Sequence, residues 1–489
     1  PAYGLGLGGF SILPLYYYLF LPFTLLGSGP AVQAFGNGFF SFLSIPLFSF
    51  LVYQILENIS FSKRIFFCGL AGFWYSLLYS DFFISNFQWN PSSLPFFVLF
   101  FSYLYDLKLK NLKRPKVQCL AWAASGVVLA ILMSLHSSAL FVMPVVYVIL
   151  SIAYILKVYR WRRLNPQLAA PLVGYGAAAI ALLPYWVHEF QNSFSNTKGI
   201  LKTITAASGG EESLPLPLYV WDKISNLFLH YINLIRQVYL WDDSLLAAII
   251  AIATMGLAIV LLGPAFKGNR NLWLVWVSIW GLLLLAASNI DANSSVFYYK
   301  SLMIHAPIVL TVVALAYSQL SRPKTAALWT VVFAFVLLSW GRNLYYDAQF
   351  MGAKYGSNHL MNTRELAQIM QQLPEEANIC DPRIARKRKK LNQYNYISTY
   401  VLPTSPGVVS ECEAGNYVIH PKRILDIQGN FLNTSDYQST YFIEPEQSER
   451  VKLWPVLAVT DNEPFSGDGT LFLETETAAV YQLSSFDDG

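Results

Sequence analysis

Residues 4–27 read GLGLGGFSILPLYYYLFLPFTLLG, a glycine-rich lead followed by three consecutive tyrosines and a short apolar run. A membrane-spanning helix needs about 20 apolar residues, and the run from Leu13 to Leu26 is shorter and interrupted by proline. Tyrosine suits the membrane surface, because its ring is apolar and its hydroxyl stays in water. The stretch predicts a flexible loop leading into an aromatic helix at the membrane surface, with an interfacial anchor as the simpler interpretation.

The composition of the whole chain indicates a membrane protein. Of its 489 residues, 55% are hydrophobic and 13% are charged, and the mean hydropathy is +0.41. Soluble proteins of this size do not have such a balance, so we expect most of the chain to lie in lipid. The net charge of +4 is small and gives no indication of a nucleic-acid partner. No nucleotide-binding loop, dinucleotide fingerprint or nucleophile elbow is present.

Apolar runs separated by short polar links predict ten spans, and therefore a mainly α, polytopic helical membrane protein. The runs cover residues 32–56, 64–84, 90–106, 117–134, 138–157, 167–188, 244–263, 272–288, 301–318 and 325–340. The sequence starts at Pro1 in the middle of a predicted loop. We expect one more span upstream, which gives eleven in the full chain.

Lysine and arginine gather in alternate links between these runs, which predicts the orientation of the chain. The links near residues 63–64, 108–116, 157–163, 267–270 and 322–324 are basic, whereas residues 85–89 and 135–137 contain neither Lys nor Arg. The basic side is expected to be cytoplasmic. Residues 4–27, the long loop 189–243, the link 289–300 and the C-terminal part then lie outside.

The chain divides, by composition, into a transmembrane domain of residues 1–345 and a soluble extracytoplasmic domain of residues 346–489. Within the outer loop, residues 219–241 form an amphipathic stretch suited to the membrane surface. In the soluble part, a capping box at Asn362 and Glu365 predicts a helix that ends at Leu373. Short strands are predicted at residues 378–380, 396–402, 415–420 and 471–483, which makes a small α+β domain.

Two cysteines, Cys380 and Cys412, fall in this outer domain, where an oxidising compartment allows a disulfide between them. Cys68 and Cys119 fall near the cytoplasmic ends of predicted spans and are expected to remain buried thiols. No Cys and His spacing resembles a zinc site. The sequence leaves open whether a divalent cation acts as a cofactor.

Asp81 is the clearest candidate for a catalytic group. It lies in LLYSDFFISN near the outer end of the second predicted span, without a basic neighbour in sequence. A carboxylate there is costly unless it is solvated, paired or bound to a cation, so a functional role competes with that of a simple charge at a helix end.

Other polar residues at the outer ends of spans could line a cavity beside Asp81. Asn90 precedes Pro91 at the start of the third span, where an N-cap is the simpler reading. His136 lies in the turn between the fourth and fifth spans, where a structural hydrogen bond is the simpler reading. The predicted cavity lining consists of Tyr16, Tyr17, Asn86, Asn90, His136 and Tyr299.

Three cations are candidates for holding an anionic lipid headgroup. Lys300 follows Tyr299 directly before the ninth span, and His305 lies one turn further on. A lysine at this depth could equally anchor the span by extending to the interface. Arg342, after the tenth span, is the next candidate. The run RKRKK at residues 386–390 is a solvated loop by default and a phosphate or glycan contact as the alternative.

Three segments, in order, resemble motifs of bacterial glycosyltransferases of the GT-C superfamily, in the branch of protein O-mannosyltransferases and aminoarabinose transferases. LPLYYYL at residues 13–19 looks like the family's GPLYYYL segment. ISNFQWNP at residues 84–91, with Leu94 and Pro95, is similar to YSRxxWNPxxLP. LHSSAL at residues 135–140, with Pro144, is similar to LHxSALxxxP. The resemblance covers about residues 1–190 by motif and the remainder by topology.

The resemblance implies transfer of a sugar from a polyprenyl-phosphate carrier to a glycan, lipid or protein acceptor at the outer face of the bacterial inner membrane. In the family, an acidic residue of the first outer loop acts as general base. That residue would lie upstream of Pro1, and residues 1–54 contain no Asp or Glu. Asn86 stands where the family has Arg, which removes one phosphate contact.

Two other classes of function remain as alternatives. A non-catalytic subunit could keep this fold and scaffold a partner complex. A transporter or flippase is the weaker alternative, because matching halves with short broken helices are not evident in the sequence. An acidic residue shortly before Pro1, after one apolar span, would favour the enzyme.

Overall fold

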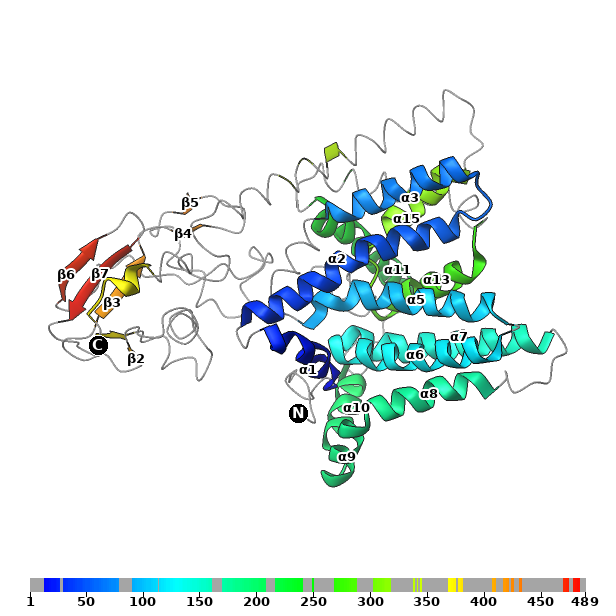
Figure 1. Ribbon diagram of the computed structural model, residues 1–489, viewed down its shortest axis with the longest axis horizontal. Coiled ribbons are helices and arrows are strands. Elements are labelled where there is room, and N and C mark those ends of the chain that lie inside the picture. The colour runs from blue at the N-terminus through cyan, green and yellow to red at the C-terminus, as the bar shows by residue number, and fades with distance from the viewer. Residues whose placement is uncertain are drawn as a thin grey trace. The chain divides into compact units, whose positions relative to one another are not determined.

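The long apolar runs form the helices of the first of two units, residues 1–344, in the computed structural model (Figure 1). The structure describes residues 13–26, 30–78, 90–112, 114–160, 169–207, 216–240, 268–287 and 302–317 of this unit, with single helical positions at 249, 337–338, 341 and 344. In the second unit, residues 345–489, it describes 368–374, 377–380, 407–409, 417–421, 424–425, 431–432, 469–474 and 478–483.

The first unit is helical throughout its described ranges. Its elements are α1 (Leu15–Phe20), η1 (Leu21–Leu26), α2 (Pro30–Ile55), α3 (Phe61–Ser76), η2 (Asn90–Ser93), α5 (Leu94–Lys110), α6 (Pro115–Leu135), α7 (Ser137–Arg160), α8 (Ala170–Ala181), α9 (Leu183–Gln191), α10 (Ser195–Ala207), α11 (Leu216–Leu234), η4 (Ile235–Leu240), α13 (Arg270–Ala287) and α15 (Ala306–Tyr317). Helices α2, α6, α7 and α13 follow the predicted spans to within three residues, whereas α3 ends at Ser76, α5 is shifted by four residues and α15 starts five residues late.

In the described part, three helical stretches are long and apolar enough to cross a membrane. They are Phe35–Ile55, Pro115–Leu135 and Ser137–Tyr159. Shorter apolar stretches, such as Arg270–Leu285 and Ala306–Tyr317, also belong to the unit. The chain is therefore a mainly helical membrane protein, and the count of ten or eleven spans stays a prediction.

The span predicted at residues 167–188 is not one straight helix. α8 and α9 meet at Leu182 with a bend of 62°, and together they are apolar enough to make one further span. Pro184 lies in the first turn of α9, where its ring and its missing N–H prevent the helix of α8 from continuing straight. Periodicity in the sequence missed the bend, because the hydrophobic run is continuous across it.

Small residues bring α6, α7 and α8 into direct contact. A Cβ atom added to Gly126 of α6 would lie 1.9 Å from the carbonyl oxygen of Gly174 in α8, so the two backbones touch. A Cβ on Gly174 would lie 1.9 Å from the hydroxyl oxygen of Tyr147 in α7. Helices in membranes commonly pack through such small residues, because close backbone approach supplies the contact energy.

A buried lysine lies beside this contact. Lys108 of α5 is fully buried, and its Nζ donates a hydrogen bond of 2.6 Å to Oγ of Ser125 in α6. The same nitrogen lies 3.6 Å from the ring centroid of Trp122, and the Tyr105 and Tyr147 rings are further away at 5.6 and 5.5 Å. Aromatic faces and one hydroxyl therefore hold this ammonium group inside the bundle.

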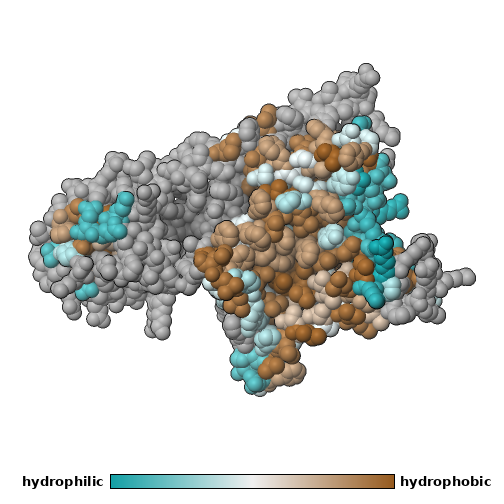
Figure 2. All heavy atoms as spheres, in the orientation of Figure 1, coloured by the Kyte–Doolittle hydropathy of each residue, from teal (hydrophilic) through white to brown (hydrophobic). Residues whose placement is uncertain are grey.

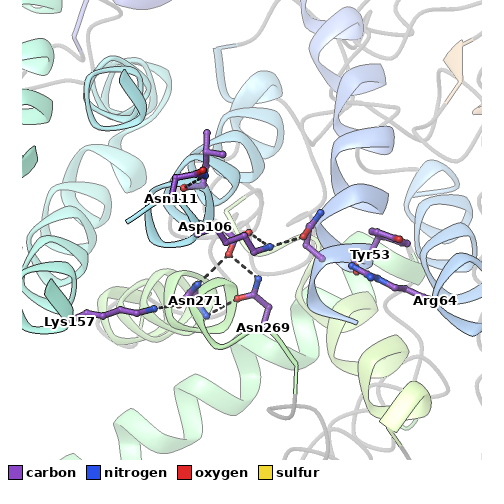
Figure 3. A network of polar contacts seen from close by, with 10 residues as sticks. Tyr53, Arg64, Asp106, Asn111, Lys157, Asn269 and Asn271 are labelled. Carbon is purple, nitrogen blue, oxygen red and sulfur yellow. Dashed lines mark hydrogen bonds and ion pairs between the residues drawn. The ribbon is translucent and has the colours of Figure 1, made fainter. Parts of the chain in front are cut away.

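The basic links between α2 and α3 and between α5 and α6 lie at one end of the helical unit, here called the basic end. A network of polar side chains joins the helices at this end (Figure 3). Asp106 of α5 forms an ion pair of 2.7 Å with Lys110 and accepts hydrogen bonds from the side-chain amides of Asn269 (2.9 Å) and Asn271 (3.4 Å). Lys157 of α7 donates to Asn271 at 3.2 Å. The network ties α5, α7 and α13 together.

The surface of the first unit has the polarity that a bilayer requires. Figure 2 shows an apolar surface over the middle of the helices, α2 and α5 included, and hydrophilic residues at the basic end. Large apolar side chains are exposed on several helices, among them Phe42 on α2 and Ile152 on α7. This face is suited to contact with hydrocarbon chains.

The second unit contains a five-stranded sheet in its described part, with the strand order β2-β1-β3-β7-β6. The strands are β1 (Asn378–Cys380), β2 (Gly407–Val409), β3 (Tyr417–Pro421), β4 (Ile424–Leu425), β5 (Phe431–Leu432), β6 (Gly469–Glu474) and β7 (Ala478–Leu483). β1 pairs in parallel with β2 and β3, and β7 pairs antiparallel with β3 and β6; β4 and β5 pair separately.

Two of the four predicted strands are observed, and a third is observed as two strands. β1 matches the prediction, and β3 begins two residues later than expected. The run at residues 471–483 forms two antiparallel strands instead of one, because both halves alternate in polarity and pair with each other. The strand predicted at residues 396–402 lies outside the described residues.

Candidate functional site

Three polar side chains from separate elements meet at the end of the first unit opposite the basic end. Asn37 of α2 is fully buried and accepts a hydrogen bond of 3.0 Å from the hydroxyl of Ser93 in η2. Asn37 is also hydrogen-bonded to the hydroxyl of Tyr16 in α1. We call Tyr16, Asn37 and Ser93 the polar cluster; it joins α1, α2 and η2.

Local sequence explains how Tyr16 and Ser93 reach this position. α1 starts after Pro14, whose carbonyl accepts from the Tyr17 N–H, and the helix turns Tyr16 inward while Tyr17 remains 38% exposed. Burial raises the pKa of Tyr16 to about 12 against the lowering effect of its hydrogen bond to Asn37, so its hydroxyl stays protonated. η2 is a single 3₁₀ turn, and Pro95 lies in the first turn of α5.

His136 occupies the sharp turn between α6 and α7 and acts as the N-cap of α7. Its Nδ1 accepts the backbone N–H of Ser138 at 3.2 Å and lies 2.9 Å from the Ser138 hydroxyl. Burial lowers the pKa of His136 to about 4. The ring is therefore neutral near pH 7, as an acceptor at Nδ1 requires. The structural reading of His136 given by the sequence matches this geometry.

An apolar cluster places the His136 turn next to the start of α1. Leu13 belongs to one buried apolar cluster with Ala130 of α6, Leu140 of α7 and Tyr185 of α9. η2 in turn packs against α2, α5 and α6. Elements that carry Tyr16, Asn90 and His136 therefore converge at one end of the bundle, although these residues are far apart in the sequence.

Glu189, near the end of α9, is a buried carboxylate that the sequence did not single out. It accepts hydrogen bonds from the backbone N–H of Thr197 (2.8 Å), the Thr197 hydroxyl (2.5 Å), the backbone N–H of Asn196 (3.2 Å) and the hydroxyl of Tyr185 (3.4 Å). These bonds cap α10 and occupy the acceptor positions of the carboxylate. Glu189 therefore has a structural role and is not a candidate for proton transfer.

His305 lies deeper in the bundle than the outer interface at which the sequence placed it. Its ring is fully buried between Trp276, Trp280 and Phe48, at centroid distances of 5.2, 5.5 and 6.1 Å. Neither ring nitrogen has a hydrogen-bond partner in the described structure. Its backbone carbonyl accepts the N–H of Val309 and so starts α15. A role in donor binding stays a prediction for this residue.

Several predicted site residues lie outside the described residues. These are Asp81, Asn86, Tyr299, Lys300, Arg342 and Cys412, together with the RKRKK run at 386–390. For Asn90 and Cys380 the structure gives the backbone element and not the side chain. The distances between Asp81, Lys300 and His136 therefore stay predictions, as does the disulfide.

Sequence reasoning missed Asn37 and Ser93, and a signal for both exists. Asn37 interrupts an apolar run in α2, and a fully buried asparagine needs a partner because leaving its amide unpaired is costly. Ser93 lies two residues after Pro91 of the WNP segment. The described side chains of the site are neutral hydroxyl and amide groups. Such groups can orient a polar ligand through hydrogen bonds.

The comparisons with known proteins give one structural likeness. No family model matches the chain, and no curated protein matches it. Among solved structures, it resembles an oligosaccharyltransferase of Archaeoglobus fulgidus tethered with an acceptor peptide that contains the NVT sequon. The identity is 12%, the TM-score is 0.34, and the match covers 85% of this chain and 62% of that one, so the chain spans less than two thirds of that protein. A TM-score at this level does not establish a shared fold.

Proposed function

We propose that the chain is a GT-C-like membrane glycosyltransferase that transfers a sugar from a polyprenyl-phosphate-linked donor to an acceptor at the extracytoplasmic face. One observation carries the proposal. The three segments that resemble the family's motifs are separated by many residues, yet α1, η2 and the α6–α7 turn lie at one end of the bundle. Of these, α1 and η2 are joined through Asn37.

The polar cluster supports a binding site for a neutral, hydroxyl-rich group at this end. Tyr16 keeps its proton, and Asn37 fixes it against η2, so the position of the hydroxyl is set before a ligand arrives. Such preorganisation lowers the cost of binding. We assign Tyr16, Tyr17, Asn90 and His136 to the wall of this site, with Asn86 and Tyr299 beside them.

The chemistry requires a base and a cation, for which we propose residues outside the described ranges. An inverting displacement at the anomeric carbon needs a carboxylate to take the proton of the acceptor hydroxyl, and Asp81 is our candidate. The departing phosphate needs a positive group, for which we propose Lys300 with Arg342 and His305. The acceptor is a glycan, lipid or protein in the bacterial inner membrane.

A transfer assay with purified protein in nanodiscs tests this function. The donor is a polyprenyl-phosphate sugar with a radioactive label, and the labelled product is measured with candidate acceptors. Asp81→Asn should lower the rate by at least about 100-fold, the usual contribution of a general base. Glu57→Gln, a change at the basic end, serves as the matched control and should leave the rate unchanged.

Unchanged transfer by the Asp81→Asn variant would remove Asp81 from the mechanism. No transfer by the native protein with any donor, combined with stable co-purification of a partner membrane protein, would favour the alternative of a non-catalytic subunit.

A further inference from the structure

Aromatic rings in contact with one another form a strip along α2 and α5, exposed on α2 and half-buried on α5. We call the following six residues the aromatic ladder: Phe35, Phe39, Phe96, Phe100, Tyr103 and Phe50. Phe23 contacts both Phe35 (6.2 Å between centroids) and Phe39 (5.7 Å). The buried Phe40 joins Phe39 (5.6 Å) to Phe96 (5.3 Å).

The lower part of the ladder is regular. Phe96, Phe100 and Tyr103 follow one another along α5 at helical spacing, and neighbouring rings are stacked with interplanar angles of 13° and 21°. Tyr103 then meets Phe50 of α2 at 5.9 Å. The rings of Phe35, Phe39 and Phe50 are 57, 41 and 42% exposed, so the ladder presents ring surface that the protein does not cover.

The ladder begins at the polar cluster. Tyr16 contacts Phe20 at 4.9 Å, and Phe20 contacts Phe23 and Phe40 at 5.8 and 6.0 Å. A lipid whose head group lies at this end of the helical unit therefore has ring surface next to its tail. Figure 2 shows the apolar surface over α2 and α5 in which this strip lies.

The length of the ladder distinguishes between two kinds of lipid. Phe35 and Phe50 are fifteen residues apart on α2, which is about 22 Å along the helix. One leaflet contributes about 15 Å of hydrocarbon to a bilayer. A phospholipid chain anchored at the polar cluster ends before the ladder does, whereas a polyprenyl chain continues past the middle of the bilayer.

We infer that the aromatic ladder holds the isoprenoid tail of a polyprenyl phosphate whose head group lies beyond the polar cluster, at the same end of the helical unit. This inference rests on the proposed function, because it names the path of the donor lipid. Methyl-branched, unsaturated chains expose C–H groups to the ring faces, and those contacts are individually weak and collectively large.

Photo-crosslinking maps the path without using activity. Two long-chain polyprenyl phosphates carry a diazirine, one close to the phosphate and the other at the far end of the tail. In nanodiscs, the first should label peptides near Phe35, and the second should label peptides near Tyr103 and Phe50. Labelling of either probe elsewhere on the helices, for example on α7, would overturn the inference.

Binding of paired variants supplies the second measurement. In Phe39→Leu with Phe100→Leu, the affinity for a long-chain polyprenyl phosphate should fall on the order of tenfold, and that for farnesyl phosphate should fall less. Phe66→Leu with Phe73→Leu changes two exposed rings of α3, outside the ladder, and should bind as the native protein does. Native mass spectrometry gives both affinities, and the thermal midpoints of the two variants check their folding.

The outcomes separate the inference from the proposed function. Sugar transfer with labelling outside the ladder would leave the function standing and remove the ladder. Ordered labelling without transfer would keep the ladder and remove the enzyme. Equal competition by phosphatidylglycerol at the ladder would show an ordinary lipid-facing surface and would contradict the inference.

Discussion

At the scale of single residues, the structure assigns His136 to a helix cap, and this assignment has a consequence for pH. Nδ1 accepts the N–H of Ser138, so the ring has to be neutral at that atom. Burial lowers the pKa of His136 to about 4, below its ordinary value of about 6.5. Because the folded pKa is the lower one, the unfolded chain binds the proton more readily, and acid favours unfolding.

We expect the thermal midpoint in detergent to fall as the pH is lowered from about 6.5 to 4. Above about pH 6.5 the ring is neutral in both the folded and the unfolded state, so His136 does not contribute to the pH dependence of stability there. His136→Asn keeps an acceptor for the Ser138 N–H and does not titrate, so this variant should show a weaker dependence. Circular dichroism melts at several pH values measure both. Identical slopes for the two proteins would argue against the cap.

At the scale of elements, the contact between α6 and α8 is the feature most sensitive to substitution. A methyl group on Gly126 would collide with the backbone of α8, which cannot rotate away as a side chain can. Gly176 lies on α8 itself, where an added Cβ meets nothing within 4 Å. The two positions therefore form a matched pair.

Gly126→Ala should lower the free energy of unfolding by about 1–3 kcal/mol, the usual cost of overpacking. Gly176→Ala should leave it unchanged or raise it by about 0.5–1 kcal/mol, because alanine is the better helix former. Thermal or denaturant unfolding in a fixed detergent compares the variants. Equal stability of both would mean that α6 and α8 are not in backbone contact.

The sequence predicted elements better than it predicted their breaks and their polar contacts. Hydrophobic runs located α2, α6, α7 and α13 to within a few residues, since length and hydropathy alone define such helices. The bend at Leu182 was missed because α8 and α9 are both apolar. The bond between Asn37 and Ser93 joins positions 56 residues apart, and no local pattern encodes such a pair.

At the scale of the whole molecule, the orientation predicted from basic links determines the chemistry of the cysteines. Cys68 and Cys119 are free thiols in the helical unit, but Cys68 is half-buried and Cys119 is exposed, so the expectation that both are buried was wrong. Cys380 is the last residue of β1. Cys412 follows β2 in the sequence, and β2 is paired with β1. An extracytoplasmic second unit would be exposed to an oxidising compartment.

We expect Cys380 and Cys412 to be joined by a disulfide. Alkylation of the unfolded protein without reductant should modify Cys68 and Cys119 and leave the other pair unmodified, and peptide mass spectrometry identifies the sites. In the chain-entropy model, closing the loop between Cys380 and Cys412 raises the free energy of unfolding by roughly 3–4 kcal/mol. Alkylation of all four thiols would contradict both the disulfide and the orientation on which it rests.

Lys108 has a consequence for the order in which the helices assemble during synthesis. Its hydrogen-bond partner Ser125 and the nearest ring, Trp122, are translated after it, whereas the more distant ring of Tyr105 lies on the same helix. A new α5 thus enters the bilayer with a charge that lacks its closest partners, and the long side chain can extend to the basic end in contact with water. Once α6 and α7 have been synthesised, Lys108 can move to its buried position. The packing of α5, α6 and α7 around Lys108 is therefore completed only after α7 has been made.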